Sequence, residues 1–182
     1  KSDVIISFGD VVYNSSFITN FVKNLDKSMI NILTDETWKT RFNRDKRSIA
    51  KAEKIVVGDN GNVICASRDL HSSSAISGEY TGVCFINKES SKEVISSINY
   101  LLKSKKSKGK YPIGFMDLFS EILKTNIKIK NHFSGGNWAE LDNIKDFYSF
   151  TFGSKSQTLK NLKGSIKKAK VLSQFSFTVK DW

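Results

Sequence analysis

An apolar segment near the start of the chain, Val4-Ile5-Ile6-Ser7-Phe8-Gly9-Asp10, predicts a buried strand that ends in a carboxylate. In α/β folds the carboxyl end of such a strand commonly carries ligand-binding or metal-binding residues. A second acidic stretch, Gly135-Gly136-Asn137-Trp138-Ala139-Glu140-Leu141-Asp142, lies far along the chain. Together the two stretches offer oxygen ligands for Mg²⁺, which accepts one or two carboxylates plus substrate phosphates. Gly-Asp pairs are also common in turns, so a turn or a helix cap remains the alternative.

The residues that follow the first strand predict an α/β fold. Residues 15–25 place apolar side chains at helical spacing, with Ser15 or Ser16 as the expected N-cap. Residues 29–33 predict another strand. The resulting strand–helix–strand order is typical of a βαβ unit in a mostly parallel sheet.

The middle of the chain predicts further strands and helices. Asn60-Gly61 is a strong hairpin signal between expected strands at 53–57 and 62–66. The other expected elements are a strand at 79–86, helices at 90–103 and 117–124, and a strand at 127–133.

The net charge of +11 over 182 residues indicates attraction to polyanions. One alternative function is therefore a noncatalytic basic module that binds RNA or another polyanion. The lysines are spread along the chain, however, and the densest run, residues 103–110, predicts a solvated loop, so contact with nucleic acid is the less favoured hypothesis. No apolar run approaches 18 residues, so neither a transmembrane helix nor a membrane partner is expected.

The two cysteines, Cys65 and Cys84, each lie in a strand-like apolar segment. This position favours buried free thiols in a reducing, cytoplasmic compartment over a disulfide. His71 and His132 do not lie near cysteine pairs with the spacing of zinc ligands, so no zinc site is predicted.

Five stretches, in this order, resemble one enzyme family. They are Ile5-Ile6-Ser7-Phe8-Gly9-Asp10, Trp38-Lys39-Thr40-Arg41-Phe42, Ala52-Glu53-Lys54-Ile55, Gly78-Glu79-Tyr80-Thr81-Gly82 and Trp138-Ala139-Glu140-Leu141-Asp142. The chain from about residue 4 to 150 is similar to the later two-thirds of the sugar and phosphocholine nucleotidyltransferases, and above all to their cytidylyltransferase branch. The resemblance implies an α/β/α sandwich around a mixed, mostly parallel sheet.

The resemblance also implies a reaction and a metal cofactor. A phosphate or phosphonate oxygen of the acceptor attacks the α-phosphorus of a nucleoside triphosphate, CTP being favoured, and pyrophosphate leaves. The expected acceptor is phosphocholine, aminoethylphosphonate or a sugar phosphate. By motif match, Asp10 and Asp142 hold Mg²⁺ against the α-phosphate. The alternative for Asp10 is a cap or turn, and for Asp142 the N-cap of a following helix.

Six further residues are candidates for substrate binding under this resemblance. Trp38, Tyr80 and Trp138 are expected to form an aromatic wall for an ammonium headgroup, with a core position as the alternative. Glu79 supplies negative charge to that headgroup, and Glu140 orients it or a water molecule; both are equally consistent with surface strand positions. Arg41 meets the acceptor phosphate with its planar guanidinium, or is exposed on a helix.

One departure from the family concerns the nucleotide site. The family has a glycine-rich loop followed by a basic residue near its N-terminus, and this chain shows no such segment. The chain is therefore expected to be an N-terminally truncated nucleotidyltransferase domain, inactive without the upstream segment. An exposed sheet edge that favours self-association is a further expectation.

The last part of the chain predicts a separate module. Residues 155–170 predict a strongly basic helix. Phe152-Gly153-Ser154-Lys155-Ser156-Gln157-Thr158-Leu159 and Phe177-Thr178-Val179-Lys180-Asp181-Trp182 resemble the opening of a phosphoenolpyruvate-synthase-like module. The expected organisation is a nucleotidyltransferase domain over residues 1–150 and the start of a further module over residues 151–182.

Overall fold

The computed structural model describes residues 2–40, 46–70, 75–104, 112–136, 138–141, 144, 147–148 and 158. The chain divides into two compact units, Lys1–Trp138 and Ala139–Trp182. The architecture below is that of the first unit. The predicted basic helix at 155–170 falls almost wholly outside the described residues, and the boundary expected at residue 150 stays a prediction.

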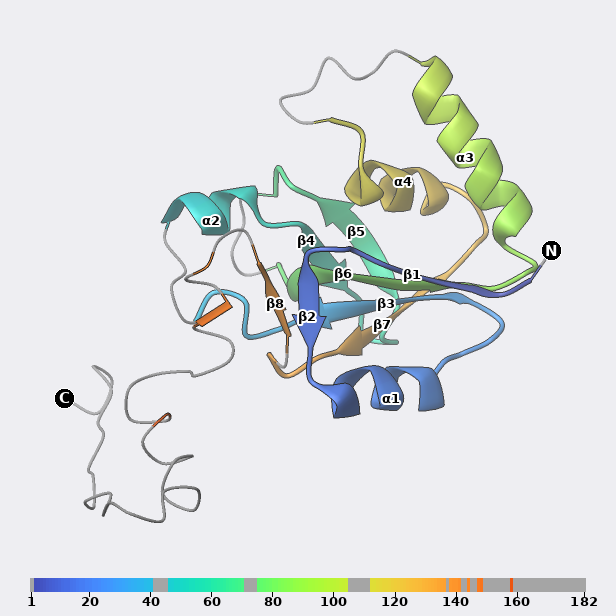
Figure 1. Ribbon diagram of the computed structural model, residues 1–182. Helices are drawn as coiled ribbons and strands as arrows, with labels where there is room; N and C mark the ends of the chain where they lie inside the picture. The colour runs from blue at the N-terminus through green and yellow to red at the C-terminus, as the bar shows by residue number, and fades with distance from the viewer. Residues whose placement is uncertain are drawn as a thin grey trace, which may run out of the picture. The chain divides into compact units, whose positions relative to one another are not determined.

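A six-stranded sheet with helices on both faces forms the first unit (Figure 1). The main path of this sheet has the order β5-β4-β6-β3-β7, and β1 also pairs with β6. A separate two-stranded sheet consists of β2 and β8. In chain order the elements are β1 (Val4–Ser7), β2 (Val11–Tyr13), α1 (Ser15–Lys23), β3 (Ile30–Asp35), α2 (Lys46–Lys51), β4 (Lys54–Val57), β5 (Val63–Ser67), β6 (Gly78–Ile86), α3 (Ser91–Lys103), α4 (Phe115–Ile122), β7 (Ile129–Phe133) and β8 (Trp138–Glu140).

The α/β class and the mixed sheet are confirmed, but the expectation of a mostly parallel sheet is wrong. Of the five pairings within the six-stranded sheet, only that of β3 with β7 is parallel. β1 and β3 run in the same direction, yet each pairs with β6, which runs the opposite way between them. The opening strand–helix–strand segment is therefore a split βαβ unit whose strands are separated by a later antiparallel strand.

β6 changes partners at Gly82. The last bond to the β1 segment is from the Phe8 N–H to the Gly82 carbonyl, at 3.0 Å, and the Tyr80 N–H donates to the Glu53 carbonyl, just before β4, at 2.7 Å. β1 and β4 thus occupy successive parts of one edge of β6. Gly82 has φ +83°, and a Cβ there would lie 2.6 Å from the Phe8 ring. Only glycine accepts both the positive φ and this close approach.

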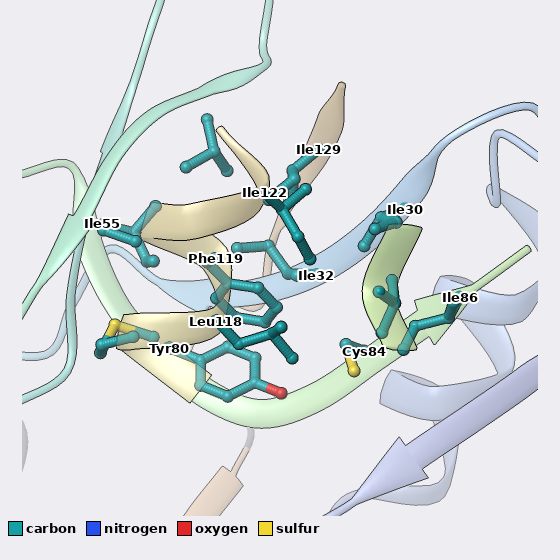
Figure 2. Packing of buried hydrophobic residues seen from close by; sticks show 14 of the residues in the cluster. Ile30, Ile32, Ile55, Tyr80, Cys84, Ile86, Leu118, Phe119, Ile122 and Ile129 are labelled. Carbon is teal, nitrogen blue, oxygen red and sulfur yellow. The ribbon is translucent and has the colours of Figure 1, made fainter. Parts of the chain in front are cut away.

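The larger hydrophobic core lies between the sheet and helices α3 and α4. Ile30, Ile32 and Ile129 project from neighbouring strands, and Figure 2 shows Phe119 and Ile122 of α4 close to them. Phe119 is 1% exposed, and complete burial of such a side chain contributes about 1.5–3 kcal/mol. This packing makes α4 the principal cover of the sheet on this face.

Helix α1 covers the opposite face of the sheet. Its Phe17 and Phe21 pack against Leu33 of β3, together with Val83, Phe85 and Trp138. The N-cap is Asn14 and not Ser15 or Ser16, because the Asn14 side chain accepts the Ser16 backbone N–H at 3.2 Å. Asparagine is as good a capping residue as serine, so the serines that follow it are free to begin the helix.

The predicted hairpin forms between β4 and β5, and its tip reaches β7. Gly61 has φ +74°, as its Asn-Gly turn requires. The Asn131 N–H donates to the Gly61 carbonyl at 3.0 Å, and the Lys130 ammonium donates to the Asn60 carbonyl at 3.1 Å. The hairpin is therefore tied to a strand that is distant from it in the sheet order.

One edge of β1 has no strand partner within the described part of the chain. The prediction of a buried first strand is wrong, because three of the four residues of β1 are exposed, among them Val4 and Ile5 at 46% each. Both cysteines are free thiols, as predicted, but only Cys84 is buried and Cys65 is half-buried. Burial raises the pKa of Cys84 to about 11. No helix in the described part of the chain is long and apolar enough to cross a membrane.

We expect Gly82→Ala to lower the free energy of unfolding by about 2–4 kcal/mol, because it adds backbone strain and a clash with Phe8. The measurement is urea unfolding followed by circular dichroism. Gly9→Ala is the matched control, since a Cβ at Gly9 meets nothing within 4 Å. Equal losses in the two variants would contradict the role assigned to Gly82.

His132 should make stability depend on pH. Its Nε2 lies 2.8 Å from Asn31 Oδ1, while the Asn31 amide nitrogen donates to the carbonyls of Asp26 and Met29, so Nε2 carries the proton of a neutral ring. Burial, aided by Lys130, lowers the pKa of His132, and Asp26 opposes the shift. The unfolded chain, with a histidine pKa of about 6.5, binds the proton more readily. Stability is therefore complete above about pH 6.5 and falls as the pH decreases below it.

We expect His132→Gln to flatten this dependence, because an amide donates to Asn31 without titrating. The measurement is the free energy of unfolding between about pH 5 and pH 7.5, the range that brackets the histidine pKa. The same slope in the variant and in the unmodified protein would show that His132 is not its source.

Candidate functional site

The carboxyl ends of β1, β3 and β7 lie at the same edge of the main sheet, because the three strands run in one direction. Gly9-Asp10 follows β1, Asp35 ends β3, and Ser134-Gly135-Gly136 follows β7. Ligand sites of α/β sheets form at this type of edge. We therefore take this edge of the first unit as the candidate site.

A buried carboxylate, Asp35, lies at the centre of this edge. The side chain is 0% exposed. Its Oδ1 accepts the Thr37 backbone N–H at 2.8 Å and the Thr37 hydroxyl at 2.7 Å, and its Oδ2 accepts the Trp138 indole N–H at 3.0 Å. Several donors of this kind are what a buried carboxylate requires.

Asp35 is not among the residues predicted from the sequence, because the predicted strand ends at residue 33. β3 continues to Asp35, and all six of its residues are buried. The signal that was present is the same as in the first strand: an apolar run, Ile30-Asn31-Ile32-Leu33, followed after one residue by an aspartate. Asn31 within the run weakened the apolar pattern.

The connection between β7 and β8 packs closely against the end of β3. The Ser134 N–H donates to the Thr34 carbonyl at 2.9 Å, and the Gly135 N–H donates to the Glu36 carboxylate at 3.2 Å. Gly136 has φ +78°, and a Cβ there would lie 2.7 Å from the Thr37 hydroxyl oxygen. Glycine at 136 is therefore what permits this close approach.

Asp10 lies in the turn after β1 and is exposed. No hydrogen bond or ion pair links its carboxylate to another described residue. Nearby, Ser7 and Tyr13 hydroxyls are 2.7 Å apart. Burial raises the pKa of Tyr13, the Ser7 hydrogen bond opposes this shift, and the Asp10 charge adds to it. An exposed carboxylate with uncommitted oxygens suits a hard cation such as Mg²⁺.

A row of buried charged residues crosses three strands beside Asp35. Glu79 of β6 is paired with Asp35 of β3 on one side and with Lys54 of β4 on the other. Residues paired in this way project from the same face of a sheet. The Lys54 ammonium donates to the carbonyls of Ala50, at 3.0 Å, and Arg68. Burial lowers the pKa of Lys54, while Asp69 and Glu79 oppose the shift.

The three predicted aromatic residues are all buried, but they do not share one surface. Trp38 is 2% exposed and Trp138 is 4% exposed. Trp138 packs on the α1 face and bonds to Asp35 on that same face. Tyr80 follows Glu79 in β6 and so projects from the other face, where it packs edge-on against Phe8 and Phe119.

The remaining predicted residues are not placed in the candidate site. Arg41 and Asp142 lie outside the described residues. Glu140 is exposed and belongs to the second unit. Within the described ranges, no group of three or more His, Cys, Asp or Glu side chains is arranged to hold a metal ion. Mg²⁺ needs fewer protein ligands than this when substrate phosphates complete its coordination.

Comparisons with known proteins bear on the fold. No known family matches the chain, and no curated protein matches it. A solved structure described as the inositol-1-phosphate CTP transferase from T. maritima is similar, with a TM-score of 0.56 and 18% sequence identity. The match covers 94% of this chain and 59% of that structure. The likeness therefore shows an α/β fold shared with a nucleotidyltransferase, over about three fifths of that enzyme's length.

We expect Gly136→Ala to lower the free energy of unfolding by about 1–3 kcal/mol, because it strains the backbone and collides with Thr37. Thr37→Ala removes the colliding oxygen. In a double-mutant cycle the double variant should therefore lose less stability than the sum of the two single variants. Strictly additive losses, measured by urea unfolding, would contradict the contact.

Proposed function

We propose that the chain is part of a Mg²⁺-dependent nucleotidyltransferase that joins a nucleotide, CTP being favoured, to a small phosphorylated or phosphonate acceptor. The observation that carries the proposal is the sheet edge itself, where the exposed Asp10 follows β1 and the buried Asp35 ends β3, on either side of β6. The fold shared with a solved CTP transferase supports it. Because the chain spans 59% of that structure, the activity, substrates and partners of the whole protein are part of the proposal.

Asp10 and Asp142 are the proposed ligands of Mg²⁺. Asp10 fits this role because its carboxylate is exposed and uncommitted among the described residues. When bound, the ion neutralises phosphate charge and orients the pyrophosphate leaving group. Phosphoryl and nucleotidyl transfers depend mainly on such positioning and charge neutralisation. The protein's own part is to hold the two carboxylates at a separation that one ion can bridge.

The acceptor we propose carries an ammonium group. Glu79 lies on the same face of the sheet as the Trp138 ring, next to Asp35, whose oxygens are occupied by Thr37 and Trp138. Negative charge next to an aromatic ring is the arrangement that binds ammonium headgroups. Phosphocholine and aminoethylphosphonate both combine such a headgroup with an attacking phosphate or phosphonate. Trp38, Arg41, Tyr80 and Glu140 stay predictions for this pocket.

The test is pyrophosphate release by the native polypeptide that contains these residues, with Mg²⁺, each of the four nucleoside triphosphates, and phosphocholine, aminoethylphosphonate or a sugar phosphate. We expect Asp10→Asn to reduce kcat roughly 100- to 1,000-fold, because a metal ligand supplies several kcal/mol of transition-state stabilisation.

Asp59→Asn is the matched control, since Asp59 is an exposed carboxylate at the β4–β5 hairpin and has no part in the proposed site. Its activity should equal that of the unmodified protein. Absence of nucleotide-dependent pyrophosphate release with every acceptor would reject the proposal. Salt-sensitive RNA binding that is indifferent to Mg²⁺ and to nucleotide would instead favour a basic polyanion-binding module.

A further inference from the structure

The outer edge of β1 carries backbone groups that no strand in the described part of the chain pairs with. The Phe8 N–H donates to the Gly82 carbonyl at 3.0 Å, across the edge that β1 shares with β6. Because antiparallel pairing alternates, the backbone groups of Ile6 also point toward β6, whereas those of Ile5 and Ser7 point away from it. An open row of this kind is a template for a further strand.

Neither face of β1 is fully covered. Ile6 packs against the core beneath α3 and α4, and Val4 projects from the same face but is 46% exposed. Ile5 projects from the opposite face and is also 46% exposed. A helix on one face could cover only one of these two side chains. Burial of both requires that the sheet and its covering layers continue past β1.

Helix α3 carries an exposed apolar stripe next to its buried one. The buried stripe includes Val94 and Leu101. The exposed stripe consists of Ile95, Ile98 and Leu102, which are 56%, 39% and 65% exposed. Their spacing of three and then four residues places them on one face of the helix. A face of this kind is suited to packing against a second helix.

The exposed stripe of α3 faces the same side of the first unit as the open edge of β1. On the opposite flank of α3, Glu93 lines a groove with Lys124 and the segment just before β7, and Tyr100 lies close enough to Lys124 to interact electrostatically. β7 and β1 lie on opposite sides of β6. The start of α3 is also next to the start of β1, since the Lys88 N–H donates to the Asp3 carboxylate at 2.8 Å (Figure 1).

We propose that these side chains form one docking surface, the β1–α3 surface, for a segment of the native polypeptide outside residues 1–182. The surface consists of Val4, Ile5, Ile95, Ile98 and Leu102. The docked segment adds a strand to the open edge of β1 and a helix beside α3. The inference is independent of the proposed function, because it rests on the fold alone.

Two observations favour a segment of the same polypeptide over a second copy of this chain. The match to the solved CTP transferase covers 94% of this chain but 59% of that structure, so a fold of this type carries further elements. Each copy of the chain has a net charge of +11, and two copies therefore repel one another. Docking within one polypeptide also avoids the entropy lost when two separate molecules associate.

The first test is amide hydrogen exchange in the native polypeptide that contains these residues. We expect the N–H groups of Ile5 and Ser7 to exchange at least about 100-fold more slowly than the N–H of Asn60, which is exposed at the tip of the β4–β5 hairpin. Exchange of Ile5 and Ser7 at the rate of Asn60 would overturn the inference. Protection that disappears on dilution would also overturn it, because it would indicate a second copy.

The second test identifies the docked segment by photo-cross-linking. In the native polypeptide, p-benzoylphenylalanine replaces Ile98 in one variant and Tyr100, on the opposite flank of α3, in the matched control. We expect position 98 to cross-link, within a monomer, to a peptide outside residues 1–182, and position 100 not to reach that peptide. The inference fails if position 98 gives no such product, if it cross-links to residues 1–182 or to a second copy, or if both positions reach the same peptide.

Discussion

The antiparallel strand β6 is the constraint on which the rest of the first unit depends. All nine of its residues are buried, and it pairs with β1, β3 and β4. Three strands can pair with β6 because β1 and β4 occupy successive parts of one of its edges. The change from β1 to β4 occurs at Gly82, whose positive φ and missing side chain allow the Phe8 ring to pack against its backbone. The position of β6 keeps β1 and β3 apart while leaving them parallel in direction. β6 therefore separates the carboxyl end of β1, which Asp10 follows, from the carboxyl end of β3, which is Asp35.

The two carboxylates of the candidate site, Asp10 and Asp35, differ in their exposure to solvent and in their hydrogen-bond partners. Asp10 is exposed in a turn and has no described partner, so its oxygens are available to a cation. Asp35 is fully buried, and donors from Thr37 and Trp138 satisfy it. Removing a charge from water costs several kcal/mol, so a buried carboxylate persists only where its hydrogen bonds offset that cost. One carboxylate suits ligand binding and the other suits holding the framework.

Burial of charge is concentrated in one part of the sheet. Lys54, Glu79 and Asp35 lie side by side across β4, β6 and β3, and each is at most 5% exposed. Replacing such groups by apolar ones is often neutral for stability, so a buried charged row is poor evidence of a stabilising role. The row lies at the carboxyl edge of the sheet, next to Trp138.

Much of the fold could be predicted from local sequence patterns, because helical and strand periodicity and turn chemistry act over a few residues. The sequence by itself determined helix α1 from the spacing of Phe17 and Phe21, and the β4–β5 hairpin from Asn60-Gly61. It also predicted a strand before Asp10, although β1 ends at Ser7 and is mostly exposed. Only the tertiary structure decided that β6 separates β1 from β3, that Tyr80 and Trp138 project from opposite faces, and that Asp35 bonds to a tryptophan 103 residues away. These features depend on which strand edges pair with one another. Such long-range pairing is determined by the burial of whole sheet faces, so a short stretch of sequence does not predict it.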